Sequence, residues 1–267
     1  GVIDFASQTQ IGGADARGGD AALVDGAGVL GPPSCQALPT KCGQDGGQSC
    51  CDSAVVPAST FFRSYDLAGD LDSGDPTAPA TVSEFRLDRY EVTVGRFRAF
   101  LDAGGGVRQG APALGAGGRR LNGMDGVLGW DATWTPELLG SRAALDAALA
   151  CDPTFATWTP MAASNEARPI NCLTWFEAQA FCVWDGGYLP TDAEWNAAAA
   201  GGDEQRALPW SVPAGSLVID PSYASYWSMA TQCTGSANAG CDVEDLMRGG
   251  SRPAGNGRWG HADLGGN

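Results

Sequence analysis

The stretch between residues 168 and 202 constrains the fold of this chain more than any other part of the sequence. It contains two helix starts of one kind. Thr174 is followed three residues later by Glu177, and Thr191 is followed at the same spacing by Glu194. Each pair forms a capping box, in which the Thr hydroxyl accepts from the N–H of the third helical residue and the Glu carboxylate accepts from the N–H of the Thr. The sequence therefore predicts two helices in close succession.

These helices are predicted over residues 175–185 and 192–200, and each is followed by a Gly-Gly pair that suits a helix C-terminus. The first helix is apolar on nearly all faces, which is typical of a helix buried in a large core. Four acidic side chains of the pair are candidates for acid–base chemistry: Glu177, Asp185, Asp192 and Glu194. The two Glu residues already have capping roles, and a chain with a single His offers no pairing of a nucleophile with a His base.

Upstream of this pair, the pattern of apolar residues predicts strands over residues 55–65 and 82–91. A helix is predicted over residues 94–103, with Thr93 as its N-cap. The residues expected to face inward from this helix are Phe97, Phe100 and Leu101.

Three further local predictions concern the middle and the end of the chain. A strand-like piece is expected between residues 130 and 134, and a helix over residues 137–150. His261 lies in a Gly-rich stretch, and we expect it at the surface.

The charge of the chain excludes several classes of partner. Its net charge is −15 and Lys41 is its one lysine, so no basic patch is available to bind nucleic acid phosphates or an anionic membrane surface. No run of eighteen apolar residues is present, so no transmembrane helix is predicted. Protein or glycan ligands remain open.

Nine cysteines in a chain with one His favour disulfide bonds in an oxidising compartment over a zinc site. We expect the four cysteines between residues 35 and 51 to pair among themselves, with Cys50 and Cys51 bonded to Cys35 and Cys42. The other expected bonds are Cys151–Cys172 and Cys233–Cys241. Cys182 is left over, so we expect it to be unpaired within this chain or bonded to a segment outside it.

Composition divides the chain into three parts. Residues 1–34 form a Gly-, Ala- and Asp-rich arm, residues 35–54 a small cysteine-rich knot, and residues 55–267 the main domain. Within the arm, residues 2–11 alternate as a strand does. We expect the arm to dock either on its own domain or on another copy of the chain, where it would join copies into an oligomer or a fibre.

Residues 169–202 read P-I-N-C-L-T-W-F-E-A-Q-A-F-C-V-W-D-G-G-Y-L-P-T-D-A-E-W-N-A-A-A-A-G-G. This run resembles the signature of the formylglycine-generating enzyme (sulfatase-modifying factor) family, which is close to P-V-x-x-V-S-W-x-D-A-x-x-Y-C-x-W followed by R-L-P-T-E-A-E-W-E-x-A-A-R-G-G. The resemblance covers residues 85–267. It implies an α+β fold similar to C-type lectins, irregular and loop-rich, with few helices, short antiparallel strands and disulfide bonds.

The resemblance also implies metals. Calcium in that family is held partly by an Asn and a neighbouring carbonyl, and Ser225 stands where the Asn would be. A hydroxyl is a weaker calcium ligand than an amide or carboxylate oxygen. The calcium candidates here are Ser225, Tyr226, Asp242 and Asn267.

The resemblance also implies copper, because in the family two cysteine thiolates bind Cu(I) and a sulfatase cysteine is converted to formylglycine. Residues 248–251 read R-G-G-S, as the family does before its copper-binding cysteines, but no cysteine follows them here. We interpret them as a lookalike in a loop and place any copper pair beyond residue 267. In the family, the cysteine that matches Cys182 bonds to one near the C-terminus, again outside this chain.

Three hypotheses follow. The first is a catalytically silent domain that binds a ligand, and the second a formylglycine-generating oxidase whose catalytic cysteines lie beyond residue 267. The third is a structural subunit of a surface fibre. We favour the first and third together, for a secreted, cell-surface or periplasmic protein of bacterial type.

Overall fold

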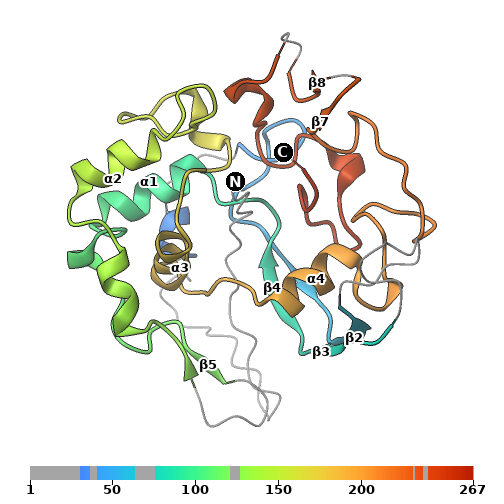
Figure 1. Cartoon of the computed structure of the whole chain (residues 1–267), viewed down its shortest axis with the longest axis horizontal. Helices are drawn as coiled ribbons and strands as arrows, with labels where there is room; N and C mark the ends of the chain where they lie inside the picture. Colours follow the sequence, from blue (N-terminus) through green and yellow to red (C-terminus); the bar gives the residue numbers. More distant parts are fainter. Residues whose placement is uncertain are drawn as a thin grey trace.

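The computed structural model describes residues 31–36, 41–63, 76–120, 127–230, 232–236 and 240–266. The strand predicted at residues 2–11 lies outside these ranges. The described chain is a mixture of short helices, short strands and long loops (Figure 1). In that view three helices gather on one side, and a bent hairpin with the fourth helix lies on the other.

The hairpin consists of four short strands. They are β1 (Ser53–Val56), β2 (Ser59–Phe62), β3 (Pro79–Val82) and β4 (Phe85–Asp88). β1 pairs antiparallel with β4, and β2 with β3. Ser53 lies opposite Asp88 and Ser59 opposite Val82, so the two ladders share one continuous register. Two residues separate β1 from β2, and two separate β3 from β4. The first of these gaps contains Pro57, which has no N–H to donate to a ladder. The strand predicted over residues 55–65 is thus divided between β1 and β2. The strand predicted over residues 82–91 is interrupted at residues 83 and 84 and ends at Asp88.

The part of the chain that the structure describes forms four α-helices: α1 (Val94–Asp102), α2 (Arg142–Leu149), α3 (Trp175–Trp184) and α4 (Asp192–Ala200). Both predicted capping boxes are confirmed. The N–H of Thr174 donates to Glu177 Oε2 and that of Thr191 to Glu194 Oε2, each over 2.8 Å. α3 ends one residue earlier than predicted, and Gly201 closes α4 with a φ of 68°.

Two predictions in the middle of the chain are wrong. The residues expected to form a strand between 130 and 134 belong instead to the 3-10 helix η3 (Ala132–Glu137). Asp131 caps this helix, because its carboxylate accepts from the N–H of Thr133 at 2.8 Å. The helix predicted from residue 137 begins only at Arg142, because Ser141 is its N-cap and the chain before it is extended.

The remaining elements are short. The 3-10 helices are η1 (Pro33–Cys35), η2 (Arg108–Gly110), η4 (Ser164–Ala167), η5 (Gly202–Glu204), η6 (Val243–Asp245) and η7 (Pro253–Gly255). The small hairpins are β5 (Arg119–Arg120) with β6 (Val127–Leu128) and β7 (Trp227–Ser228) with β8 (Gln232–Cys233). Within the described ranges, no helix has the length and apolar character needed to cross a membrane.

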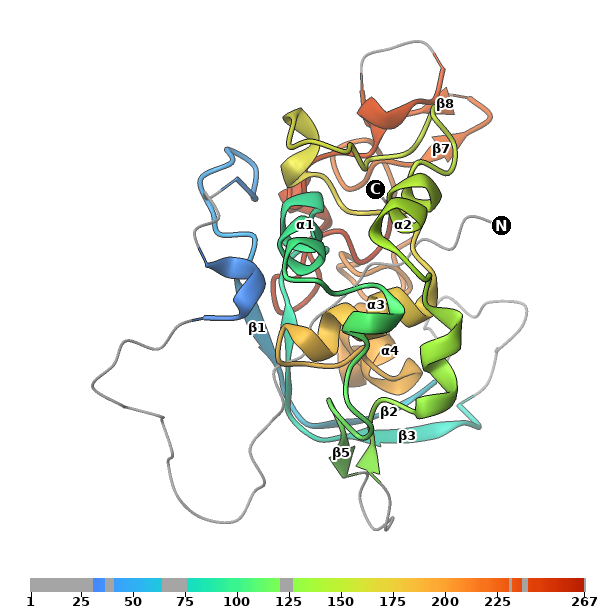
Figure 2. The ribbon, with the colours of Figure 1, turned by 90° about the vertical axis from the view of Figure 1, so that its left-hand side faces the viewer.

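The hydrophobic core has two main parts. The larger one joins α1, α2 and α3, and Phe97, Phe100 and Phe181 pack there at centroid distances of 5.5 to 5.8 Å. The prediction that Phe97 and Phe100 face inward is confirmed. The smaller part holds the strands against α4 through Ala197 and Ala198. In Figure 2 the strands β2 and β3 run beneath α3 and α4, as a floor for the helices.

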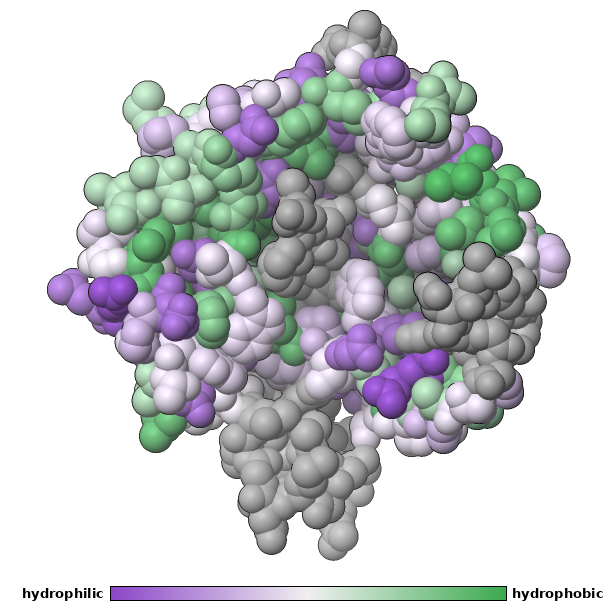
Figure 3. Space-filling view, viewed as in Figure 1, coloured by the Kyte–Doolittle hydropathy of each residue, from purple (hydrophilic) through white to green (hydrophobic). Residues whose placement is uncertain are grey.

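One surface segment is strongly apolar. Between α4 and β7, the side chains of Val212, Leu217, Val218 and Ile219 are 44 to 78% exposed. Figure 3 shows strongly hydrophobic side chains on the right-hand side of the molecule, over this segment.

Candidate functional site

Two disulfide bonds close the cysteine-rich knot at the start of the described chain. Cys35 bonds to Cys51 and Cys42 to Cys50. The second bond is buried beside Tyr90 and Ala262 in a small apolar cluster. The knot therefore packs against residues that follow it by about forty positions and by more than two hundred.

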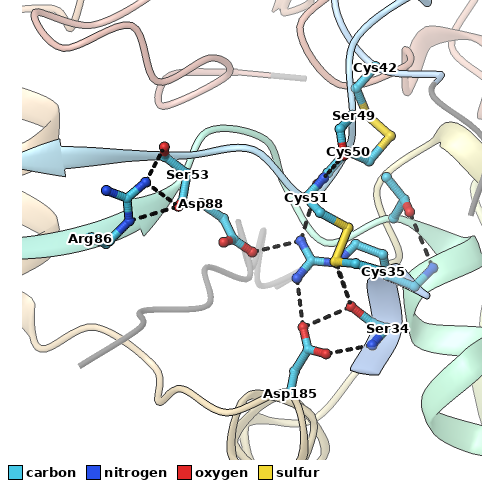
Figure 4. Close-up of polar contacts among 12 residues, drawn as sticks. Ser34, Cys35, Cys42, Ser49, Cys50, Cys51, Ser53, Arg86, Asp88 and Asp185 are labelled. Atoms are coloured by element: carbon cyan, nitrogen blue, oxygen red, sulfur yellow. Dashed lines mark hydrogen bonds and ion pairs between the residues drawn. A yellow bond between two sulfur atoms is a disulfide. The ribbon is translucent and has the colours of Figure 1, made fainter. Parts of the chain in front are cut away.

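A buried ion cluster fastens the knot to the helices. Arg96 of α1 is fully buried and contacts Asp88 at the end of β4 over 2.6 Å and Asp185 at the end of α3 over 2.7 Å. Its guanidinium also donates to Ser34 Oγ at 2.9 Å and to the Cys50 carbonyl at 3.2 Å. Figure 4 shows Asp88 and Asp185 converging beside the two knot disulfides.

Asp185 is also bound by Ser34, the residue just before the knot. The backbone N–H of Ser34 donates to its Oδ1 at 2.7 Å, and the Ser34 hydroxyl donates to its Oδ2 at 2.8 Å. Burial disfavours the Arg96 cation, but the two carboxylates outweigh burial and the pKa of Arg96 is raised. The cluster holds one cation and two anions, and the donors of Ser34 help to satisfy the second anion.

The other five cysteines lie away from this cluster. Cys151 is bonded to Cys172, and Cys233 to Cys241. Cys182 is fully buried in the core formed by α1, α2 and α3. All nine cysteines of the chain are thus in disulfide bonds or enclosed by the core.

Two of the predicted calcium residues, Ser225 and Asp242, already have structural contacts. The Ser225 hydroxyl donates to the Asp245 carbonyl at 2.7 Å, and Asp242 caps η6 by accepting from the N–H of Glu244 at 2.8 Å. Asn267 lies outside the described residues. Among those residues, no three His, Cys, Asp or Glu side chains are close enough together to hold a metal ion. Calcium stays a prediction.

The expectation of a surface His261 is wrong. Its side chain is fully buried, and neither ring nitrogen has a hydrogen-bond partner of normal geometry within the described part of the chain. Burial, helped by the nearby Arg89 cation, lowers the pKa of His261 to about 4. The unfolded chain therefore takes up this proton between about pH 6.5 and pH 4, and the contribution of His261 to stability is lost as the pH falls through that window.

The contribution of Asp263 to stability depends on pH in the opposite direction to that of His261. Burial raises the pKa of its carboxyl to about 6, although the N–H of Gly250 donates to it at 2.6 Å. The folded chain therefore holds a proton on Asp263 between about pH 4 and pH 6, and its contribution to stability grows as the pH falls through that window.

A cavity lies between the knot, η4, η6 and the turn at residues 247–251. Its volume is about 590 Å³, within the range of small-molecule sites. The polar residues that line it are Lys41, Asp45, Ser164, Arg168, Ser236, Glu244, Arg248 and Ser251.

Two arginines build the walls of this cavity. Arg168 donates to the Val243 carbonyl at 2.8 Å and pairs with Glu244, which fixes η6. Arg248 donates to the carbonyls of Gly43 at 3.2 Å and Gln44 at 2.7 Å, and so fixes a turn of the knot. The segment interpreted as an R-G-G-S lookalike thus contributes Arg248 and Ser251 to the cavity lining.

Sequence reasoning identified neither the ion cluster nor the cavity. One signal was available for the first: Arg96 precedes Phe100 by four positions and so lies on the inward face of α1, where an arginine needs buried partners. The cavity draws its lining from four separate segments, and no local pattern connects them.

Comparisons with known proteins place this geometry in context. The model of the Sulfatase-modifying factor enzyme 1-like domain matches residues 40–267. The formylglycine-generating enzyme of Thermomonospora curvata is 27% identical over 169 residues, which cover 58% of this chain and 51% of that protein. The inactive C-alpha-formylglycine-generating enzyme 2 of Mus musculus is 27% identical over 172 residues, covering 60% and 51%.

A hercynine oxygenase of Mycolicibacterium smegmatis is 27% identical over 247 residues, which cover 88% of this chain and 48% of that protein. The chain spans about half the length of these curated relatives. Their names include two kinds of enzyme and one inactive protein.

Proposed function

The chain belongs to the family of Sulfatase-modifying factor enzyme 1-like domains, and on that premise we propose that it is an extracellular or cell-surface domain that binds a ligand and is catalytically silent in this form. The observation that carries the proposal is the state of the cysteines. Eight of them form four disulfide bonds, and Cys182 is 0% exposed. They serve the stability of the domain.

Copper does not fit these residues. The family resemblance implies two accessible, reduced thiolates for Cu(I), a soft metal that prefers soft ligands. The disulfide sulfurs of this chain are not thiolates, and the Cys182 sulfur is enclosed by the core. We therefore derive no oxidation step within this chain.

Two observations support a binding role. The cavity beside the knot is large enough for a small ligand or for a segment of a protein, and it is lined by several charged side chains. The C-type-lectin-like architecture that we propose for the family hosts many binding functions, although fold alone does not decide between them. The disulfide bonds support an oxidising compartment.

A peptide oxidation assay tests this proposal. The chain is incubated with a sulfatase-derived cysteine peptide, Cu(I) and oxygen, and the formylglycine product is sought by mass spectrometry. The Thermomonospora curvata relative serves as the positive control. We expect product from the relative and none from this chain; product formation by this chain would refute the proposal.

A thiol count provides a second test of the same observation. A maleimide reagent should label no cysteine of the native chain. After unfolding without reductant it should label one cysteine, which peptide mapping should place at Cys182. Rapid labelling of two cysteines in the native state would contradict the silent form.

The alternative is a copper-dependent formylglycine-generating oxidase whose catalytic cysteines lie beyond residue 267. The match to proteins named as enzymes over about half their length favours it. Repeating the peptide assay on any longer protein that contains this chain separates the two functions, because only the oxidase would form product there.

Assembly through residues 1–34 is a further part of the proposal. Light scattering coupled to size exclusion, on the chain with and without these residues, should show larger particles only when they are present. A monomer in both samples would refute an oligomer or a fibre.

A further inference from the structure

We propose that the cavity between the knot and the turn at residues 247–251 binds one carboxylate group of a ligand, held by Lys41 and Arg248. This inference rests on the proposed binding function and names the chemistry of its ligand.

The cavity collects positive charge in a strongly acidic chain. Lys41, Arg168 and Arg248 all line it, although the chain has only 16 Lys and Arg residues against 31 Asp and Glu. Lys41 is the one lysine of the chain. Three segments that lie far apart in the sequence therefore each place a cationic side chain at this cavity.

The three cationic side chains differ in how far they are free to bind a ligand. Arg168 is occupied by Glu244 and by carbonyl groups of the η6 segment. Arg248 uses its Nε and Nη2 on two backbone carbonyls, which leaves N–H groups of its five-donor fork for a ligand. The ion pairs of the described residues involve neither Lys41 nor Arg248.

Charge balance sets the charge of the ligand group. Arg168 and Glu244 neutralise each other, so Lys41 and Arg248 stand against Asp45. Two positive charges and one negative charge leave an excess of one positive charge. A single carboxylate balances this excess, whereas a doubly charged phosphate would leave one negative charge uncompensated.

The position of Arg248 also favours a carboxylate. Its guanidinium is held beside the turn of the knot, and a Cβ atom added at Gly46 would lie 3.1 Å from its Nη1. The N–H groups left over, on Nη1 and the second one on Nη2, lie side by side at the end of the guanidinium and match the two oxygens of a carboxylate. The hydroxyl of Ser164 lines the same space and adds a further donor. Because the cavity is much larger than a carboxylate, it also has room for the rest of a larger ligand.

An NMR titration of the ¹⁵N-labelled chain tests the inference. The probes are acetate, a blocked peptide with one glutamate, the same peptide with glutamine, and phosphate and sulfate, all at equal ionic strength. We expect saturable shifts of the amides of Gly46, Gly249 and Ser236 with acetate and with the glutamate peptide. A tighter Kd for the peptide identifies a protein side chain as the source of the carboxylate, and an equal or tighter Kd for acetate identifies a free small acid.

Variants supply the controls. Lys41→Gln changes an exposed side chain and should weaken carboxylate binding about three- to fivefold at low salt, and Arg248→Gln should weaken it further. Arg108→Gln, which removes an exposed arginine bound to the Pro136 carbonyl, should leave the Kd unchanged.

Four results would overturn the inference: equal shifts from the glutamate and glutamine peptides, tighter binding of phosphate or sulfate, shifts away from the cavity, or equal weakening by Arg108→Gln. These results are independent of the oxidation assay. Carboxylate binding by a chain that also oxidises the peptide would refute the silent function and retain this site. A chain that does neither would refute the site alone.

Discussion

Replacing Arg96 by methionine should destabilise the domain far more than the same change at an exposed arginine. The change removes a cation with 0% side-chain exposure and leaves Asp88 and Asp185 with 3% and 0% side-chain exposure. It also leaves the Ser34 hydroxyl and the Cys50 carbonyl without the donor that joins them to α1. Methionine is a flexible, unbranched apolar side chain that can donate no hydrogen bond.

The expected loss follows from the burial of the cluster. Breaking a buried ion pair from one side costs about 3–5 kcal/mol, because the remaining charge is left unpaired. We therefore expect Arg96→Met to lower the free energy of unfolding by about 4 kcal/mol, a large part of the ~5–15 kcal/mol of a typical domain. Arg96→Lys keeps the charge but loses the planar fork, so it should cost less. Adding Asp88→Asn and Asp185→Asn to Arg96→Met should recover part of the loss, because the unpaired charges are then gone.

Urea unfolding, followed by tryptophan fluorescence under non-reducing conditions, measures these values. The matched control is Arg86→Met on β4, because Arg86 also donates several hydrogen bonds, here to the hydroxyl and carbonyl of Ser53. Those bonds are exposed to solvent, and their loss should cost less than about 1 kcal/mol. Equal losses for Arg96→Met and Arg86→Met, or a loss below about 1 kcal/mol for Arg96→Met, would refute the reasoning.

Three further predictions concern other parts of the domain. Relative to the unmodified chain, His261→Gln should gain stability as the pH falls from 6 to 4, because the loss that His261 causes in this range is removed. Asp263→Asn should lose stability relative to the unmodified chain over the same range, by up to about 3 kcal/mol, and urea midpoints that keep a constant difference from the unmodified chain for both variants would exclude the assigned shifts. Gly255→Ala should lower the free energy of unfolding by at least about 1–3 kcal/mol, because the added Cβ would lie 1.8 Å from a backbone carbonyl oxygen. Gly47→Ala, with open space around it, should lower it by less than about 1 kcal/mol, and similar melting temperatures for the two variants would contradict this packing. If the predicted calcium site exists, excess calcium should raise the melting temperature and Asp242→Asn should reduce that rise, whereas no rise in the unmodified chain would exclude calcium.

The helices that could be predicted are those with short-range signals. A capping box places donor and acceptor three residues apart, so α3 and α4 were identified from Thr and Glu positions alone. The N-cap of α1 was identified in the same way from Thr93, which accepts from the N–H of Arg96 at 3.3 Å. The strands were predicted in the right parts of the chain but each as one piece, whereas the hairpin is interrupted beside Pro57 and each predicted strand is divided between two.

The parts that could not be predicted depend on contacts between distant residues. The partners of Arg96 lie 8, 46, 62 and 89 positions away from it. His261 follows the same rule, since a Gly-rich surrounding suggests a surface loop and only the fold places it against Leu87 and Ala54. Local composition describes the neighbours in sequence, and burial is decided by the neighbours in space.

The knot and the helical core are stabilised together, and the ion cluster explains why. The boundary predicted between residues 54 and 55 falls inside β1. Because β1 pairs with β4, the chain passes from the knot directly into the hairpin. Across that boundary, Ser34 supplies two donors to Asp185, and the Cys50 carbonyl accepts from Arg96. If the knot moved away, a buried cluster with one excess negative charge would lose these partners, at a cost that increases with its burial. The same rigid knot forms one wall of the cavity through Gly43 and Gln44, so the contacts that stabilise the core also fix Arg248 in the position proposed for binding a carboxylate.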